Sequence, residues 1–111
     1  MPVLDLEQLK NITMDDTELM RDILATLIID TSQQLQALER ALEQADAKET
    51  ARLAHYSKGA CANVGAASTA ELLQVIERKA AAGDLQSCTV PFVSLQEEFQ
   101  KLRTEVAQLA A

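Results

Sequence analysis

The segment PFVSLQEEFQKLRTEVAQL (residues 91–109) repeats an apolar residue at alternating intervals of three and four positions. The repeating residues are Phe92, Leu95, Phe99, Leu102, Val106 and Leu109. This spacing places the six side chains along one stripe of an α-helix. A helix with one apolar stripe buries that stripe against other helices, so we predict that the segment contributes to the core of a helical bundle. Pairing with a second chain as a coiled coil is the alternative.

Working outward, the remaining sequence predicts more helices joined by short connections. A short helix is expected over residues 5–11. Thr13 is the expected cap of a long second helix that reaches Gln44, and the polar patch of residues 30–34 could kink this helix. The third helix is expected over residues 49–63, and Ser68-Thr69-Ala70-Glu71 reads as the capping box of a fourth that ends near Gly83. The 111 residues therefore predict one all-α domain, residues 1–111. Its expected fold is an antiparallel up-down four-helix bundle with an additional short N-terminal helix.

Composition excludes several classes of function. The formal net charge of -7 argues against nucleic-acid binding, which requires clustered Lys and Arg. No apolar stretch approaches the roughly 20 residues that cross a bilayer, so no membrane insertion is expected. The N-terminus has no signal-peptide pattern, and we expect a cytoplasmic protein. Cys61 and Cys88 lack metal-ligand spacing and are most simply small core residues, with a disulfide or a shared metal as the alternatives.

The third predicted helix carries the only histidine of the chain, His55. At 3.6 residues per turn, one side of this helix presents Leu53, Ser57, Ala60 and Val64 and therefore faces the core. The opposite side presents Ala51, His55, Lys58, Gly59 and Ala62. The histidine is thus expected to point outward, beside one cation and among very small side chains.

These residue types suit a phosphoryl carrier. A neutral, exposed imidazole is a good nucleophile toward phosphorus, and Lys58 can stabilise phosphoryl oxygens from the next turn. Gly59 costs about 1 kcal/mol in a helix interior relative to alanine, which close approach of a partner backbone explains. Small side chains at Ala51 and Ala62 leave room for that partner. Taken singly, the same residues fit an ordinary surface histidine, a solvated lysine and a glycine at a helix–helix contact.

The pattern Ala54-His55-x-x-Lys58-Gly59, followed by Asn63-Val64-Gly65-Ala66, resembles the signature of histidine-containing phosphotransfer (HPt) domains. The similarity extends from Leu38 to Asp46 upstream and through Ile76-Glu77 and Gly83-Asp84 downstream. Two positions depart from the family, because Ser57 and Thr69 stand where a large apolar residue is common.

The resemblance implies that His55 receives a phosphoryl group from the aspartyl phosphate of a receiver domain, or from a hybrid sensor histidine kinase, and passes it to another receiver aspartate. Lys58 would be its electrostatic neighbour, and Gly59 the point of closest approach. The expected partners are response-regulator receiver domains, and Mg²⁺ would belong to the receiver, so this chain needs no cofactor.

The family also often has a polar side chain that leans over the histidine from the preceding helix. Matching the chain to the family pattern places Ser32 there, with Gln33 as the alternative. The predicted receiver-docking surface then extends along the same helix to Ile28. This surface would also include Ala51, Gly59 and Ala62.

Two other classes of function compete with the phosphoryl carrier. A non-catalytic adaptor, a helical bundle that binds a signalling partner, fits the bundle pattern equally well but has no need for an exposed His-Lys-Gly face. A self-contained kinase or hydrolase fits poorly, because the chain has no glycine-rich nucleotide loop and no paired base. A monomer is expected, since the bundle buries its own apolar stripes.

Overall fold

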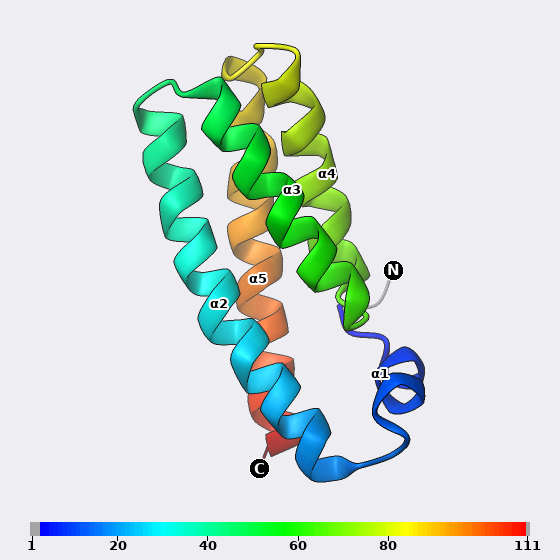
Figure 1. Ribbon diagram of the computed structural model, residues 1–111. Coiled ribbons are helices and arrows are strands. Elements are labelled where there is room, and N and C mark those ends of the chain that lie inside the picture. The colour runs from blue at the N-terminus through cyan, green and yellow to red at the C-terminus, as the bar shows by residue number, and fades with distance from the viewer. Residues whose placement is uncertain (1–2, 111) are drawn as a thin grey trace.

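The computed structural model describes residues 3–110, all of which are helical or lie in short connections. The helices are α1 (Leu6–Thr13), α2 (Thr17–Glu43), α3 (Ala47–Asn63), α4 (Ala67–Ala81) and α5 (Thr89–Ala110), and a short 3₁₀ turn, η1 (Gln86–Cys88), precedes α5. In Figure 1, α2 to α5 form an antiparallel up-down bundle, and α1 lies at the end where α3 finishes. The predicted fold is confirmed. None of the helices within residues 3–110 has the length and apolar character required to span a bilayer.

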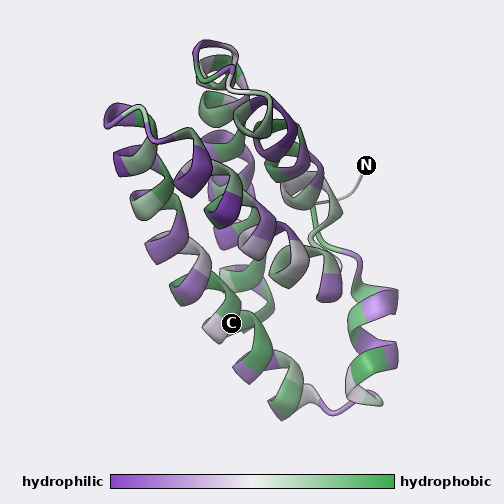
Figure 2. Cartoon of the chain, turned by 45° about the horizontal axis from the view of Figure 1, so that its top comes forward, coloured by the Kyte–Doolittle hydropathy of each residue, from purple (hydrophilic) through white to green (hydrophobic). Residues whose placement is uncertain are grey.

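The core is mainly aliphatic, and hydrophobic and hydrophilic residues alternate along the helices (Figure 2). The α5 stripe supplies much of it: Leu95 and Leu102 are fully buried, and Phe92 and Phe99 are nearly so. Toward the C-terminal end of α5 the stripe becomes more exposed to solvent, and Leu109 is 39% exposed. The stripe is therefore bundle core over most of its length, as predicted.

The cap predicted for the long helix is wrong. Asp16, and not Thr13, is the N-cap of α2, because its carboxylate accepts a hydrogen bond from the backbone N–H of Leu19 at 3.0 Å. Thr13 instead ends α1, and its hydroxyl donates to the carbonyl of Leu9 at 2.8 Å. From Thr17 onward α2 is continuous through the polar patch of residues 30–34.

The predicted capping box of α4 is also wrong. The helix begins at Ala67, and its N-cap, Ala66, makes no side-chain hydrogen bond. The turn is set by Gly65, whose φ of 88° favours glycine. A Cβ atom at Gly65 would lie 2.8 Å from the carbonyl oxygen of Asp5, and the Asp5 N–H donates to the Gly65 carbonyl, also at 2.8 Å. Close approach of the N-terminal segment therefore requires glycine at this turn.

Helix α1 is attached to the last turn of α3. The side-chain amide of Gln8 donates to the carbonyl oxygens of Ala62 at 2.8 Å and Asn63 at 3.2 Å. Carbonyls in the last turn of a helix lack partners further along the helix, and these bonds, with that from the Gly65 N–H to the Ala62 carbonyl at 3.3 Å, supply partners. Leu9 is fully buried beneath α1. The N-terminal helix thus caps the histidine-bearing helix.

Both cysteines are free thiols, and both are fully buried. Burial is the main reason that the pKa of the Cys61 thiol rises to about 11. Within residues 3–110 there is no group of three or more His, Cys, Asp or Glu side chains that could hold a metal ion. The cysteines therefore lie in the core as small packing residues.

Thr69 gives a prediction for stability. Its side chain is fully buried, and its hydroxyl has no hydrogen-bond partner among residues 3–110. An unsatisfied buried hydroxyl costs about 1–3 kcal/mol. Thr69→Val keeps the shape and removes the hydroxyl, so we expect the free energy of unfolding in urea to increase by about 1 kcal/mol. Thr69→Ser, which keeps the hydroxyl and removes a methyl group, is the control. A valine variant less stable than wild type would show that the hydroxyl is satisfied.

Candidate functional site

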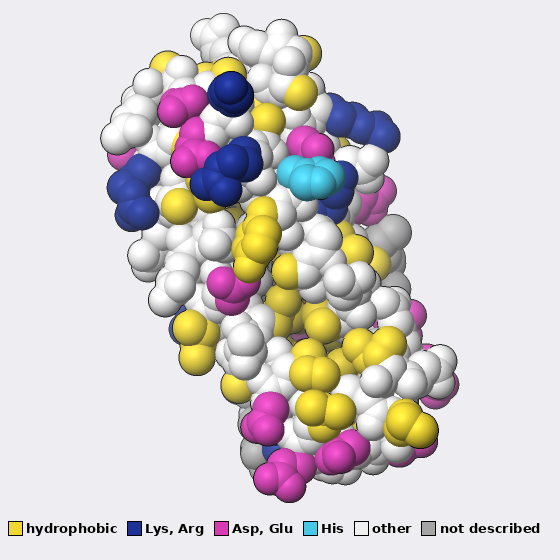
Figure 3. Space-filling model, viewed as in Figure 1, with side chains coloured by type: hydrophobic (Ala, Val, Ile, Leu, Met, Phe, Trp, Pro, Cys, Tyr) yellow, Lys and Arg dark blue, Asp and Glu magenta, His cyan; other side chains and the backbone are white. Residues whose placement is uncertain are grey.

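His55 lies on the outer face of α3 with 69% of its side chain exposed. Figure 3 shows the imidazole on the molecular surface beside an acidic and a basic side chain. Leu53 and Ser57 are buried on the opposite side of the helix. The predicted helical register is therefore confirmed, and it leaves the imidazole accessible to another protein.

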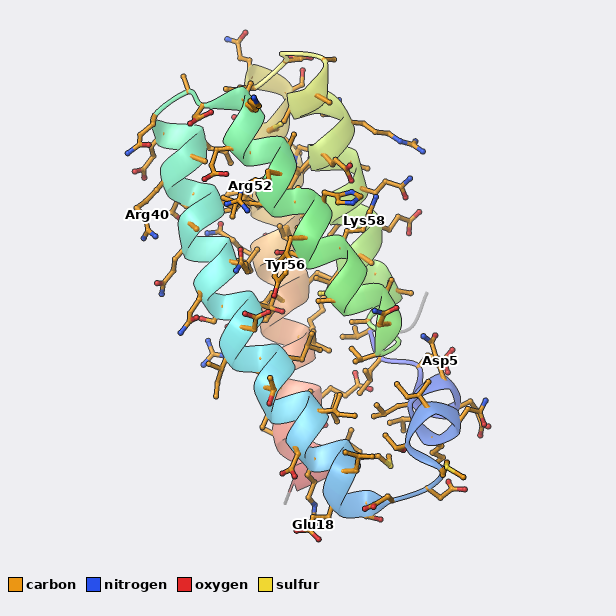
Figure 4. The ribbon with its side chains drawn as sticks, viewed as in Figure 1. Asp5, Glu18, Arg40, Arg52, Tyr56 and Lys58 are labelled. Atoms are coloured by element: carbon orange, nitrogen blue, oxygen red, sulfur yellow. The ribbon has the colours of Figure 1, made fainter. Side chains whose placement is uncertain are left out.

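A carboxylate from the next helix holds His55 and Lys58 together. Oε2 of Glu77, on α4, lies 2.9 Å from Nδ1 of His55. Oε1 of the same carboxylate lies 2.7 Å from Nζ of Lys58. Figure 4 shows Lys58 on the side of α3 that faces α4. The two oxygens of one side chain thus fix both functional groups.

The electrostatics of this triad determine which imidazole nitrogen is free. Partial burial raises the pKa of Glu77, but hydrogen bonds from Lys58 and His55 outweigh it, so the pKa lies below its usual range. The carboxylate is therefore ionised at neutral pH and accepts hydrogen bonds only. A neutral imidazole meeting it must carry its proton on Nδ1, which assigns the free lone pair to Nε2.

Several residues near His55 on the outer face of α3 have small side chains or none. Gly59 and Ala62 are exposed, and Ala51 is half-buried. A Cβ atom at Gly59 would meet no atom within 4 Å, and the backbone there does not have a positive φ. Glycine at a helix–helix contact is therefore the wrong explanation for Gly59. Nothing within residues 3–110 requires glycine at this position.

Tyr56 forms the edge of this surface on the side of α2. Its side chain points from α3 toward α2 (Figure 4) and its hydroxyl donates to Oδ2 of Asp30 at 3.3 Å. One turn earlier on α3, Arg52 pairs with Glu49. The open surface therefore lies between the Glu77 side and the Tyr56 side of α3.

Of the two docking residues predicted on α2, Ser32 lies away from His55. Ser32 lines a groove of about 200 Å³ between α2 and α5, with Gln96 and Phe99. Ile28 is half-buried and packs against the core. The reason is the rotation of about 100° per residue along a helix. Asp30 faces α3, so Ser32, two positions later, points about 200° away from it. The prediction that Ser32 leans over His55 is therefore wrong. Gln33, the alternative, is exposed and lies nearer the Asp30 side of α2.

Glu77 is the functional residue that sequence reasoning missed. It belongs to the stretch Ile76-Glu77 that resembles the family, but its spacing alone is that of an ordinary solvated helix face. Which α4 side chain meets His55 depends on the turn between α3 and α4. A polar side chain that contacts the histidine therefore comes from the following helix.

The Glu77 contacts predict a pH dependence of stability. Because the pKa of Glu77 is lowered in the folded protein, its contribution is present above the unfolded value of about 4.3 and is lost as the pH falls below it. We expect wild type to be more stable than Glu77→Gln at pH 7, and the gap to shrink between about pH 5 and about pH 3. Urea unfolding of both proteins across this range measures it. A gap that stays constant would show that the carboxylate charge contributes nothing.

A family model described as the Hpt domain matches residues 22–111. The chain belongs to the Hpt domain family. A similar solved structure is the crystal structure of histidine-containing phosphotransfer protein B (HptB) from Pseudomonas aeruginosa PAO1. The two chains are 28% identical with a TM-score of 0.91, over 96% of this chain and 93% of that one. No curated protein matches the chain.

Membership of the Hpt family identifies the chain as a histidine phosphotransfer protein of phosphorelays. The family match begins in α2, so α1 lies outside it. His55, the only histidine, lies within the match, as do Lys58, Gly59 and Glu77. The site residues on α3 and α4 are therefore all part of the Hpt domain.

Proposed function

We propose that His55 accepts a phosphoryl group from the aspartyl phosphate of a receiver domain, or from a hybrid sensor kinase, and relays it to another receiver aspartate. The observation that carries this proposal is the Glu77 bridge. It holds Nδ1 of His55 at 2.9 Å and keeps Lys58 beside the ring, while Nε2 of the exposed side chain has no hydrogen bond to residues 3–110.

The transfer step follows from these contacts. The lone pair of Nε2 attacks the phosphorus atom, a P–N bond forms, and the P–O bond to the aspartate breaks. The donor leaves as a carboxylate. The ring becomes an imidazolium that keeps its proton on Nδ1, where the ionised Glu77 stabilises the positive charge. Delivery to the next receiver is the reverse reaction, with a new aspartate as the nucleophile.

Charge supports a receiver as the partner. Although the chain is acidic overall, six of its ten Lys and Arg residues lie between positions 40 and 79: Arg40, Lys48, Arg52, Lys58, Arg78 and Lys79. Several cations lie on the face that presents His55, with some acidic side chains among them, while other acidic side chains gather at the lower end, where α2 begins (Figure 3). An acidic aspartyl-phosphate pocket complements such a face.

Magnesium remains assigned to the receiver, and this chain is proposed to act as a cytoplasmic monomer.

The adaptor remains the second candidate, because an exposed helical surface can bind a partner without chemistry. The Glu77–His55–Lys58 contacts favour the carrier. An adaptor has no use for a carboxylate that fixes the tautomer of an exposed imidazole, whereas a phosphoryl carrier depends on it.

The test is phosphate transfer from radiolabelled receiver domains of the same organism to wild type and to His55→Gln. We expect label on wild type, stable in alkali and labile in acid, and none on His55→Gln. Circular dichroism establishes that the variant is folded. Label on His55→Gln would refute the proposal, since the chain has no other histidine. Equal receiver binding by both proteins with no label on either would support the adaptor.

A further inference from the structure

Gly59 leaves an open space, called the notch below, on the outer face of α3 one turn after two rings. His55 precedes it by four residues and Tyr56 by three, so both side chains are its neighbours on the helix surface. Because no atom lies within 4 Å of the position of a Cβ at Gly59, the space above the glycine is open. A group that enters it lies one helical turn from both the imidazole and the phenol ring.

Tyr56 differs from the other aromatic residues of the chain. Phe92 and Phe99 are buried in the core, whereas Tyr56 is 52% exposed. It is the only tyrosine, and the chain has no tryptophan. Half-exposed tyrosines are enriched at protein interfaces, because a rigid ring supplies much apolar contact area at a small entropic cost.

Asp30 holds this ring in place. Its carboxylate accepts a hydrogen bond from the Tyr56 hydroxyl at 3.3 Å, which fixes the end of the ring on the α2 side. The hydroxyl is therefore occupied within the protein, and the exposed part of the ring offers an apolar surface. Fixing the ring before binding lowers the entropy lost on docking. The hydrogen bond thus keeps the aromatic ring beside the notch preorganised.

We propose that Tyr56, positioned by Asp30, is a specificity-determining residue that receives an apolar side chain of the receiver in the notch above Gly59. The inference rests on the proposed function. A receiver whose aspartyl phosphate reaches Nε2 of His55 must also cover the adjoining helix surface, where Tyr56 is the next residue and Gly59 lies one turn on, about 6 Å along α3. Gly59, Ala62 and Tyr56 on this surface carry no charge, and the neighbouring Lys58 is paired with Glu77. Receivers with an apolar residue next to the phosphorylated aspartate are therefore preferred over those with a charged one.

The test compares Tyr56→Ala with Tyr56→Phe, which keeps the ring. We expect Tyr56→Ala to raise the half-saturating concentration of phosphorylated receiver about tenfold, with little change in the maximal transfer rate. Tyr56→Phe should stay close to wild type. Asp30→Ala, which releases the ring, should have a smaller effect of the same kind. Phosphoramidate, a small donor that needs no docking, should label His55 equally in all four proteins.

A direct readout is ¹⁹F NMR of protein labelled with 3-fluorotyrosine, which gives one resonance because Tyr56 is the only tyrosine. We expect the resonance to shift on addition of receiver, and to shift less with a receiver that has a charged residue next to its aspartate. An unshifted resonance, or equal half-saturation for Tyr56→Ala and wild type, would overturn the inference while transfer to His55 continued. Absence of transfer to wild type from every receiver would instead refute the proposed function.

Discussion

Gly59→Leu is expected to be a more stable protein that hardly transfers phosphate. The side chain meets nothing within the described chain, and leucine favours a helix by roughly 0.8 kcal/mol relative to glycine. The same side chain fills the notch beside His55 and keeps the receiver from approaching. A displacement of about 1 Å between reacting groups can cost a factor of about 100, so we expect at least that loss in the rate of transfer from a phosphorylated receiver. Stopped-flow or rapid-quench kinetics measures it.

The opposite signs of the two effects make this variant informative. Gly59→Ala is the matched control, with a similar gain in stability and a much smaller obstruction. Labelling by phosphoramidate should persist in both variants, because His55 and Glu77 are unchanged. Wild-type transfer rates in Gly59→Leu would show that no receiver backbone approaches this face, and the docking surface would have to lie elsewhere on the bundle.

Glu77→Ala should slow transfer by about two orders of magnitude, as expected when a side chain that orients a catalytic imidazole is lost. Without the carboxylate, Nδ1 of His55 has lost its acceptor, and either nitrogen can carry the proton. Lys58 also loses its ion-pair partner, since its Nζ lies 2.7 Å from Oε1 of Glu77 in the wild type. Single-turnover transfer from a saturating concentration of phosphorylated receiver isolates this effect from docking.

Glu77→Gln separates orientation from charge. Its amide oxygen can accept a hydrogen bond from the Nδ1–H, but the ion pair with Lys58 is lost, so we expect a reduction in transfer rate smaller than that of the alanine variant.

Lys58→Ala removes the cation and should also slow transfer. A double-mutant cycle of Glu77→Ala and Lys58→Ala should be non-additive, because the two side chains are in contact. Unchanged transfer by Glu77→Ala would remove the carboxylate from the mechanism.

Periodicity was sufficient to predict the bundle and the orientation of the histidine. The α5 stripe and the buried Leu53 and Ser57 follow the repeat of an α-helix, which the sequence displays directly. For the same reason, the exposed set of His55, Lys58, Gly59 and Ala62 could be predicted from one helix alone.

Contacts between helices could not be predicted in the same way. The meeting of Glu77 with His55 depends on the offset between α3 and α4, which the turn at Gly65 and its contact with Asp5 set. Ser32 was misplaced because its position in the sequence does not say which neighbour that side of α2 faces. The caps at Thr13 and Ser68 failed because each competed with a nearby alternative: Asp16 in one case and the Gly65 turn in the other.

The most direct test of this account is to locate the phosphoryl group after transfer from a receiver, by long-range ¹H–¹⁵N NMR of the histidine ring, with His55→Gln alongside. The account predicts one phosphoryl group on Nε2 of His55, with the proton retained on Nδ1 next to Glu77. Phosphate on Nδ1 would contradict the role given to Glu77. Phosphate on His55→Gln would contradict the carrier itself.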